Sequence, residues 1–188
     1  MEEKPSQKGQ DWHLPACYGC GPENEHGLEA SFAFDEESGE VRFNYQAKPF
    51  ALGAPGFVHG GVLATIMDEA QGVLCFHVGH MVMTDRLSMK YHKATSLFHP
   101  FQVRSWLTAV RKKRLYTRGT IHSMEGELLV SSTAVWYMLN ERIAGRLFRH
   151  GDRMNFDRLK LIMEANRRRA RQIRQRLRQN QIPRQGKH

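Results

Sequence analysis

The sequence predicts an α+β fold in which an antiparallel sheet packs on one long central helix. Two stretches near the N-terminus alternate apolar and polar residues with the period of two that is typical of half-buried strands. A longer run then repeats apolar residues at helical spacing, and four further strand-like stretches follow it through short turns. Consecutive strands joined by short turns pair in antiparallel fashion, and a sheet of this kind buries its apolar face against a helix.

The elements are expected in the order of two strands, one helix and four strands. The first two strands should form a hairpin around the turn "EESG", and a loop rich in Pro and Gly, "AKPFALGAPGF", should precede the helix. The expected bounds are 28–34 and 40–46 for the hairpin strands, 60–79 for the helix, and 81–92, 101–112, 115–123 and 127–139 for the last four strands.

The chain divides into three parts by composition. A polar stretch at 1–14 is expected to be a flexible tail, 15–139 forms the α+β domain, and 140–188 is an Arg-rich helical extension. A stripe of mostly apolar residues runs along this extension at helical spacing. Its members are Leu159, Met163, Asn166, Ala170, Ile173 and Leu177.

The net charge of +9 belongs to the extension alone. Residues 1–139 hold 13 Lys and Arg against 15 Asp and Glu, a net charge of −2, whereas 140–188 hold 15 against 4, a net charge of +11. The domain is therefore close to neutral, and its function cannot be argued from the overall charge. The extension can pack on its own dimer, lie on an anionic membrane surface or bind RNA, and the absence of aromatic residues after Phe156 weighs against RNA stacking.

The sequence favours a soluble cytoplasmic protein. No apolar run approaches the roughly 18 residues of a membrane-spanning helix, and the first residues are unlike a signal peptide. Three cysteines, Cys17, Cys20 and Cys75, cannot all pair, which is typical of reduced thiols. Cys17-x-x-Cys20 with His26 nearby suggests zinc, but no second Cys pair or His-x-x-x-His completes four ligands, so a loop with buried thiols is the preferred interpretation.

The start of the predicted helix, "GFVHGGVLATIMDEA", holds two glycines and, further along, two acids. Backbone N–H groups at a helix N-terminus lack intrahelical partners, and a glycine lets a ligand oxygen approach them, so Gly60 and Gly61 can form an oxyanion site. They can also serve only to let the loop pack tightly against the helix. Asp68 lies on a helical stripe of small residues where a substrate can reach it, and the members of this stripe are Gly61, Ala64, Thr65, Gly72 and Cys75. Glu69 points about 100° away and is expected to be structural or solvated.

The distance between these features predicts a dimer. Eight residues of helix separate Gly60 from Asp68, a rise of about 12 Å, which is too far for both to act on one carbonyl. Two such helices antiparallel across a two-fold axis would bring the helix start of one protomer near the acid of the other, giving two equal sites. We therefore expect an obligate homodimer, or a dimer of such dimers.

Three segments in this order resemble the hotdog superfamily of acyl-CoA thioesterases, of the phenylacetate-pathway type and the related human thioesterase-superfamily proteins. These segments are "CYGCGPENEHGL", "GAPGFVHGGVLATIMDEA" and "VMTDRLSMKY", and the resemblance covers about residues 15–139. It implies a hotdog fold, in which the sheet wraps around the helix. It also implies dimers that pair edge strands, with the active site between the protomers.

The resemblance assigns roles to four residues. Asp68 matches the acid that activates water or attacks the thioester carbonyl, the backbone N–H of Gly60 the oxyanion donor, His59 the residue that buttresses this loop, and Thr84 the hydroxyl that orients water. A thioester is already activated, so a base and an oxyanion site suffice without a metal or cofactor. The products would be the free acid and coenzyme A.

The remaining candidates concern substrate binding. Gly61, Lys90 and His92 are expected near the substrate, the last two toward the nucleotide of coenzyme A. Many relatives carry Asn where this chain has Gly53, and Asn24 can take its place. This departure leaves an alternative function open, a hotdog protein that binds acyl-CoA without hydrolysing it and whose basic extension binds a membrane or nucleic-acid partner.

Overall fold

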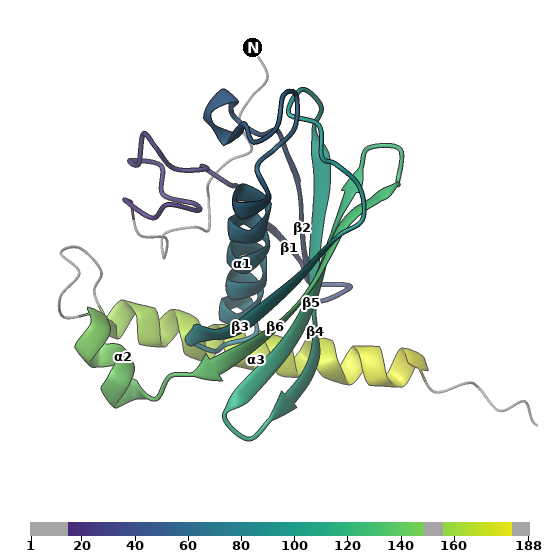
Figure 1. Cartoon of the computed structure of the whole chain (residues 1–188). Coiled ribbons are helices and arrows are strands. Elements are labelled where there is room, and N and C mark those ends of the chain that lie inside the picture. Colours follow the sequence, from purple (N-terminus) through teal and green to yellow (C-terminus); the bar gives the residue numbers. More distant parts are fainter. Residues whose placement is uncertain (1–14, 149–155, 182–188) are drawn as a thin grey trace, which may run out of the picture.

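The computed structural model describes residues 15–148 and 156–181, and the expected 1–14 tail lies outside them. The order of strands and helices is the predicted one (Figure 1). The elements are β1 (Ala33–Asp35), β2 (Glu40–Tyr45), the short 3-10 helix η1 (Pro49–Ala51), α1 (Gly60–His77), β3 (Val82–Tyr91), β4 (Phe101–Arg111), β5 (Arg114–Ser123), β6 (Leu128–Met138), α2 (Glu141–Phe148) and α3 (Phe156–Gln181).

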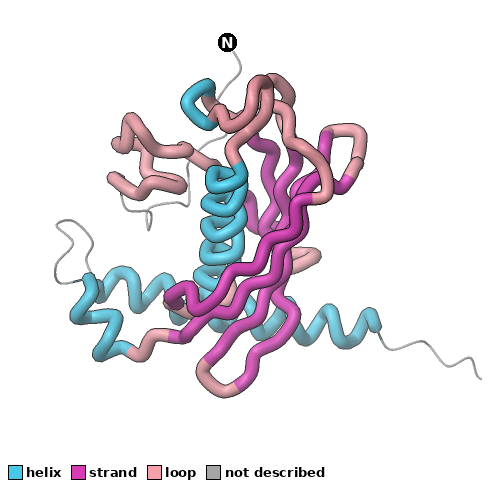
Figure 2. The backbone as a smooth tube through the Cα atoms, viewed as in Figure 1, coloured by secondary structure: helices cyan, strands magenta, loops and turns pink. Residues whose placement is uncertain are grey.

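The strands form one antiparallel six-stranded sheet in the order β1-β2-β4-β5-β6-β3. The sheet curves around α1, which confirms the prediction of an antiparallel sheet on a central helix (Figure 2). The crossover from α1 places β3 beside β6, at the end of the sheet opposite to β1. Strand β3 is therefore a long edge strand with one side unpaired in the single chain.

The core lies between α1 and the concave side of the sheet. Leu63, Ile66, Met67 and Leu74 recur at helical spacing on the side of α1 that faces the strands, and each is almost fully buried. Gly119 on β5 permits this close packing, since a Cβ there would lie 2.0 Å from the Met67 Cε atom. The opposite side of α1, with the small residues of the Asp68 stripe, is left more open.

The expected strand at 28–34 is mostly wrong, because only Ala33–Asp35 pairs as β1. Leu28, Ala30 and Phe32 are buried, as their alternation predicted. However, the amides of Leu28 and Ala30 donate to the carbonyls of Tyr18 and Gly19 in the preceding loop rather than to a strand. The alternation thus predicted correctly which side chains are buried. The backbone hydrogen bonds, however, are made with the preceding loop and not with a neighbouring strand.

A buried hydrogen-bond network fixes α1 against the sheet. Gln71 of α1 donates to the Ser132 Oγ atom at 2.9 Å and accepts from the Thr117 hydroxyl at 2.6 Å. The indole N–H of Trp136 donates to the Thr117 Oγ atom at 2.7 Å. A buried polar group that loses its hydrogen-bond partner destabilises the fold. The network therefore fixes the rotation of α1 about its axis relative to β5 and β6, and the register between these two strands.

We predict that Thr117→Val lowers the free energy of unfolding by about 2 to 4 kcal/mol, because it leaves the Trp136 N–H and the Gln71 carbonyl buried without a partner. The same replacement at exposed Thr133 on β6 serves as the control and should change stability by less than about 0.5 kcal/mol. Urea unfolding at matched protein concentrations measures both. Equal effects of the two variants would contradict the role of the network.

Helix α3 crosses the C-terminal end of α1 (Figure 1). The Asn166 side chain donates to the Phe76 carbonyl at 3.1 Å, and the Arg167 guanidinium donates to the Gly79 carbonyl at 2.8 Å. These bonds satisfy carbonyls at and just beyond the end of α1, where intrahelical donors run out. The buried members of the predicted stripe are Leu159, Met163, Asn166, Ala170 and Ile173.

This packing narrows the three interpretations of the extension. The apolar stripe of α3 is already buried on the domain of the same chain, so in this position it is not available for insertion among lipids. Leu177 lies outside the side chains that the structure describes. None of the helices within the described residues is long and apolar enough to cross a bilayer.

Candidate active site

The start of α1 leaves the Gly60 backbone amide without a hydrogen-bond acceptor among the described residues. His59 is the N-cap residue, with φ −61° and ψ 135°, and its Nδ1 atom accepts the Gly61 N–H at 2.9 Å. The next two amides both donate to the His59 carbonyl. Within the described part of the chain, the Gly60 N–H has no acceptor. The cap thus engages Gly61 and leaves the Gly60 amide free to bind an oxygen atom at the positive end of the helix.

Tyr91, at the end of β3, is a contact of this site that the sequence analysis missed. Its hydroxyl donates to the Gly60 carbonyl at 2.8 Å, which fixes the peptide that follows the exposed amide. The only signal in the sequence was its place between Lys90 and His92, both of which were named as substrate contacts. A hydrogen bond between the end of a strand and the start of a helix depends on how the chain crosses between them. No periodic pattern in the sequence predicts it.

A pocket of about 370 Å³ opens beside the helix start. Its lining residues are Phe57, Val58, Gly60, Leu63, Tyr91, His92, Lys93, Ala94 and Thr95. Among the described residues, none of those that line it carries a carboxylate. Gly60 therefore borders a partly apolar space that has room for a ligand but lacks an acid.

Gly53 fits tightly under the helix start. A Cβ atom at this position would lie 2.7 Å from the His59 Cα atom, so a larger residue requires the loop to move. A backbone hydrogen bond also joins this loop to the helix start, since the His59 amide donates to the Ala51 carbonyl at 2.8 Å. The Asn that the resemblance implies at this position has no room in this loop conformation.

The predicted pair of Asp68 and Thr84 comes together in the structure. The Thr84 hydroxyl of β3 donates to the Asp68 Oδ1 atom of α1 at 2.9 Å, and the carboxylate is half-buried. Burial raises the pKa of the Asp68 carboxyl, and the hydrogen bond from Thr84, which favours the charged form, opposes this rise. The result is a carboxylate held in a fixed orientation, as a base or nucleophile requires.

The stripe around Asp68 is open over most of its length. Gly61 is exposed, and Ala64, Thr65 and Gly72 are half-buried, as the small-residue stripe predicted. Cys75 was placed on the same stripe but is fully buried. The open side of α1 therefore ends before Cys75 and is centred near Asp68.

Glu69 has a structural environment between α1 and the N-terminal loop. It is half-buried and accepts a hydrogen bond from the Cys17 thiol, with a distance of 3.6 Å between Sγ and Oε1. Burial raises the pKa of the Glu69 carboxyl to about 7. Asp68 and Glu69 thus have separate partners, which agrees with the predicted angle between them. The contact with Cys17 was not predicted, because it depends on the path of an irregular loop.

The predicted substrate contacts are dispersed. Asn24 uses both ends of its amide within its own loop, donating to the Ala16 carbonyl at 3.1 Å and accepting the His26 N–H at 3.0 Å. His92 lines the pocket at the helix start and shares a hydrogen bond of 2.8 Å with the Ser131 hydroxyl. Lys90 instead lines a second pocket of about 340 Å³, formed by β3 to β6.

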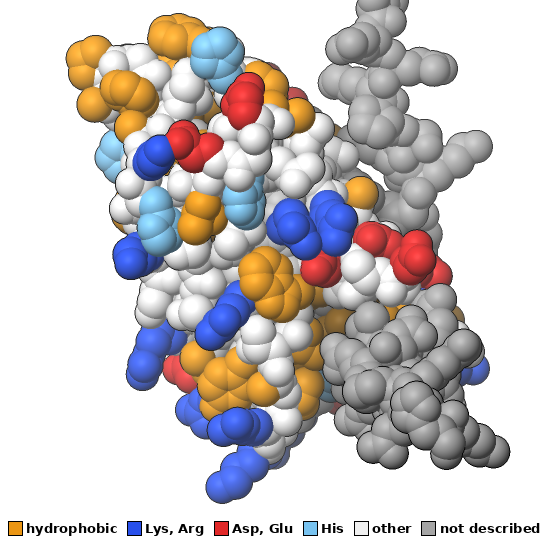
Figure 3. Space-filling model, turned by 90° about the vertical axis from the view of Figure 1, so that its right-hand side faces the viewer, with side chains coloured by type: hydrophobic (Ala, Val, Ile, Leu, Met, Phe, Trp, Pro, Cys, Tyr) orange, Lys and Arg blue, Asp and Glu red, His pale blue; other side chains and the backbone are white. Residues whose placement is uncertain are grey.

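The basic turn 111–114 lies between β4 and β5. Its residues are exposed, and Arg114 forms an ion pair with Asp85 of β3 at 3.0 Å. Lys112 has a positive φ of 53°, as a tight turn requires. On the side of the molecule away from α1, Lys and Arg side chains lie along the lower end, interleaved with hydrophobic ones (Figure 3).

The family model of the thioesterase superfamily matches residues 55–130. This segment of the chain is similar to the thioesterase superfamily. The matched segment contains the helix start with Gly60 and the pair of Asp68 and Thr84. Together with the antiparallel sheet wrapped around α1, it identifies the domain as a hotdog fold.

Known thioesterases are similar to this domain in sequence. The acyl-coenzyme A thioesterase THEM4 of Rattus norvegicus is 34% identical over 119 residues, which is 62% of this chain and 51% of that protein. The protein of the same name from Mus musculus is 36% identical over 115 residues, 61% of this chain and 50% of that protein. The chain thus spans about half the length of the curated relatives that it matches.

Solved thioesterase structures are similar in fold. A crystal structure of a thioesterase superfamily protein has a TM-score of 0.59 and 33% sequence identity, and the likeness covers 62% of this chain and 60% of that chain. A hypothetical thioesterase from Streptococcus pneumoniae, solved with coenzyme A, has a TM-score of 0.55 and 20% identity over 58% of this chain and 88% of that chain. The similarity to the Streptococcus pneumoniae protein shows only that the two folds are alike.

We predict that His59→Ala lowers the free energy of unfolding by about 1 kcal/mol, because the Gly61 amide loses its cap. His59→Asn should restore most of the loss, since Asn is a favourable N-cap residue. Urea unfolding of the full chain compares the two variants. If the Asn variant is as unstable as the Ala variant, the Nδ1 bond to Gly61 does not cap the helix.

Proposed function

We propose that the chain is an acyl-CoA thioesterase whose active site forms between two copies of the domain. The observation that carries the proposal is the arrangement on α1, where an exposed Gly60 amide and an Asp68 carboxylate oriented by Thr84 lie on one helix. The names of the relatives point to acyl-CoA as the substrate class. The cytoplasm stays the predicted location.

In the proposed reaction, Asp68 acts on the thioester carbonyl in one of two ways. It accepts a proton from a water molecule that Thr84 helps to orient, or it attacks the carbonyl carbon itself. In either case the carbonyl oxygen becomes negative, and the Gly60 N–H stabilises it by a hydrogen bond. The C–S bond then breaks and the thiolate of coenzyme A takes up a proton. If water attacked, the proton that Asp68 accepted goes to this thiolate and the free acid is already formed. If Asp68 attacked, one water hydrolyses the mixed anhydride on Asp68, which gives the free acid and restores the carboxylate.

The separation along α1 requires the second copy. Eight residues of helix place the Gly60 amide about 12 Å from Asp68, beyond the reach of one carbonyl group. The pocket beside Gly60 has no carboxylate among its described lining residues. A second α1, antiparallel to the first, would supply the Asp68 that this pocket lacks and receive the Gly60 amide in return.

Strand β3 offers the surface for this dimer. It is an edge strand of ten residues, and most of its side chains are exposed in the single chain. Met83 and Tyr91 are about half exposed, at 52% and 50%. A long edge strand with exposed apolar side chains commonly pairs with another strand, and pairing β3 with its symmetry mate would extend the sheet across both copies. A dimer of such dimers is compatible with this surface.

The alternative function, binding of acyl-CoA without hydrolysis, is favoured by one observation. Gly53 stands where many members of the family that the sequence resembles carry a polar Asn, and the loop leaves no room for a side chain at this position. The two functions differ in whether Asp68 acts on the substrate. Activity measurements on variants of this residue therefore separate them.

We predict that Asp68→Asn lowers kcat for acyl-CoA hydrolysis roughly 100- to 10,000-fold, because Asn can neither accept the proton nor attack the carbonyl. Asp35→Asn is the matched control, since Asp35 is the last residue of β1 and Asn keeps the Oδ1 acceptor for the Glu37 amide in the turn that follows. A thiol-detecting assay over a panel of acyl-CoAs measures both variants. Undiminished hydrolysis by Asp68→Asn would refute the role of Asp68, and no hydrolysis by the unaltered chain over the whole panel would favour the non-hydrolytic alternative.

A mixing experiment tests the shared site. Gly60→Pro removes the proposed oxyanion donor while keeping a helix start, because Pro is tolerated at the first helical position and the extended His59 backbone, with ψ 135°, suits a following Pro. Alone it should lower kcat about 100- to 1,000-fold. In a mixed dimer with Asp68→Asn, one of the two sites combines two unaltered residues.

Random re-association of equal amounts of Gly60→Pro and Asp68→Asn chains should therefore restore about a quarter of the unaltered activity, because half of the dimers are mixed and each mixed dimer has one intact site. The mixture is unfolded and refolded together, and activity is compared with each variant treated alone. If both residues acted within one protomer, no chain in the mixture would hold an intact site. Absence of recovery in a mixture shown to contain mixed dimers would refute the shared site.

A further inference from the structure

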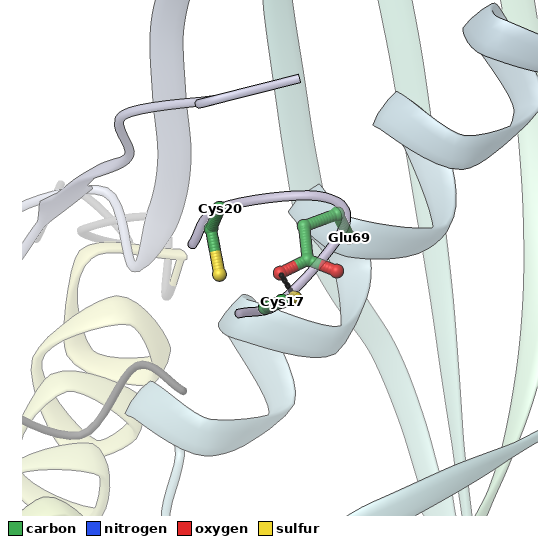
Figure 4. A group of neighbouring side chains, drawn as sticks. All are labelled: Cys17, Cys20 and Glu69. Atoms are coloured by element: carbon green, nitrogen blue, oxygen red, sulfur yellow. Dashed lines mark hydrogen bonds between the residues drawn. The ribbon is translucent and has the colours of Figure 1, made fainter. Parts of the chain in front are cut away.

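The structure brings three possible metal ligands together outside the proposed active site. Cys17 and Cys20 of the N-terminal loop meet Glu69 of α1, and one ligand atom of each lies within 4.8 Å of the others (Figure 4). All three side chains are partly buried. Nothing in the proposed hydrolysis uses them, and the two cysteines are far from Glu69 in the sequence.

The loop has the shape needed to present both thiols to one point. It turns tightly after Cys17, where the Gly21 amide donates to the Cys17 carbonyl at 2.9 Å. A Cβ on Gly21 would lie 2.3 Å from the Cys17 backbone nitrogen, so this turn excludes any larger residue. The turn holds Cys17 and Cys20 on the same side of the loop, as the C-x-x-C spacing does in zinc sites.

A second close contact brings Glu69 to the thiols. A Cβ on Gly19 would lie 2.5 Å from the Glu69 Cδ atom, so the absence of a side chain at Gly19 lets the loop rest on the carboxylate. The Cys17 Sγ atom lies 3.6 Å from Glu69 Oε1. In a tetrahedral zinc site with ordinary bond lengths, a thiolate sulfur and a carboxylate oxygen are separated by about 3.5 Å. This pair is therefore already spaced for a shared ion.

We propose that Cys17, Cys20 and Glu69 bind one zinc ion, with water as the fourth ligand. Thiolates are soft ligands that select zinc over magnesium or calcium, and two thiolates with one carboxylate and water give the four-coordinate geometry that zinc prefers. Binding displaces the protons of the two thiols, so it is favoured by high pH. Two thiolates and a carboxylate around the divalent ion leave a net charge of −1 at the site.

The ion would link the N-terminal loop to α1. Glu69 is the neighbour of Asp68, so the link would hold the loop against the part of the helix that carries the proposed catalytic acid. In this position zinc is a structural element beside the active site and is not expected to contact the substrate. This inference concerns a site that hydrolysis does not require and can be tested with the catalytically impaired Asp68→Asn chain as well.

The test is zinc uptake by the full chain. Reduced, metal-depleted protein is incubated with zinc, passed through a desalting column and analysed by inductively coupled plasma mass spectrometry. We expect about one zinc per chain, and the same value for Cys75→Ser, the matched control in which the buried thiol outside the cluster is replaced. Cys17→Ser and Cys20→Ser should retain less than a tenth of the zinc, and Glu69→Gln should bind it at least tenfold more weakly.

A measurement on the unaltered protein guards against variants that fail to fold. Cobalt added to the reduced chain should produce a thiolate-to-cobalt charge-transfer absorption in the near ultraviolet, and zinc should abolish it. The proposal is overturned if the folded, reduced chain takes up less than a tenth of an equivalent of zinc and gives no such absorption. It is also overturned if Cys17→Ser binds as much zinc as the unaltered chain, or if thiol titration and mass spectrometry show that Cys17 and Cys20 form a disulfide under reducing conditions that leave Cys75 free.

Discussion

The hydrogen bond from Thr84 to Asp68 depends on the whole arrangement of the domain. It joins β3 to α1, and β3 reaches this position because the chain crosses from the helix to the edge of the sheet beside β6. The rotation of α1 is fixed on its other side by apolar residues and by the buried bonds of Gln71. Asp68 is thus directed away from the core. Its carboxyl is only half-buried, which raises its pKa but leaves it accessible to a ligand.

One helix carries both parts of the proposed chemistry, and this is why the proposed active site needs two copies of the chain. The N-terminus of α1 offers an amide and a partial positive charge, while Asp68 lies about 12 Å further along the same axis. A single straight helix cannot bring its own start to its own middle. Two antiparallel copies can, and the small residues between these points leave space for the second copy and a substrate. The same geometry explains why the pocket at Gly60 lacks a carboxylate in the single chain.

Periodic features were predictable from the sequence, whereas irregular ones were not. The helix and the last four strands were predicted to within about two residues, because buried faces impose periods of 3.6 and 2. Asp68 was predicted from its place on the helix and from the family resemblance, and Thr84 from the resemblance alone; the structure brings the two side chains together. The bond from Tyr91 to Gly60 and the contact of Cys17 with Glu69 were missed, since each depends on where a crossover or a loop returns in space. The short β1 was overpredicted for a related reason, because the loop before it supplies the backbone partners.

Contacts with other elements fix the position of α1 at its start, at its end and in its middle. At its start, His59 caps Gly61 and Tyr91 holds the Gly60 carbonyl, so the exposed amide has a fixed direction. At its end, Asn166 of α3 binds the Phe76 carbonyl, which gives the basic extension a structural task in the domain of its own chain. Between them the N-terminal loop rests on Glu69, next to the proposed catalytic acid. A displacement of about 1 Å in a catalytic group can cost a hundredfold in rate, so the proposed site, shared by two chains, would require each chain to fix its own helix independently. Contacts that take no part in the proposed reaction would therefore position the groups that carry it out.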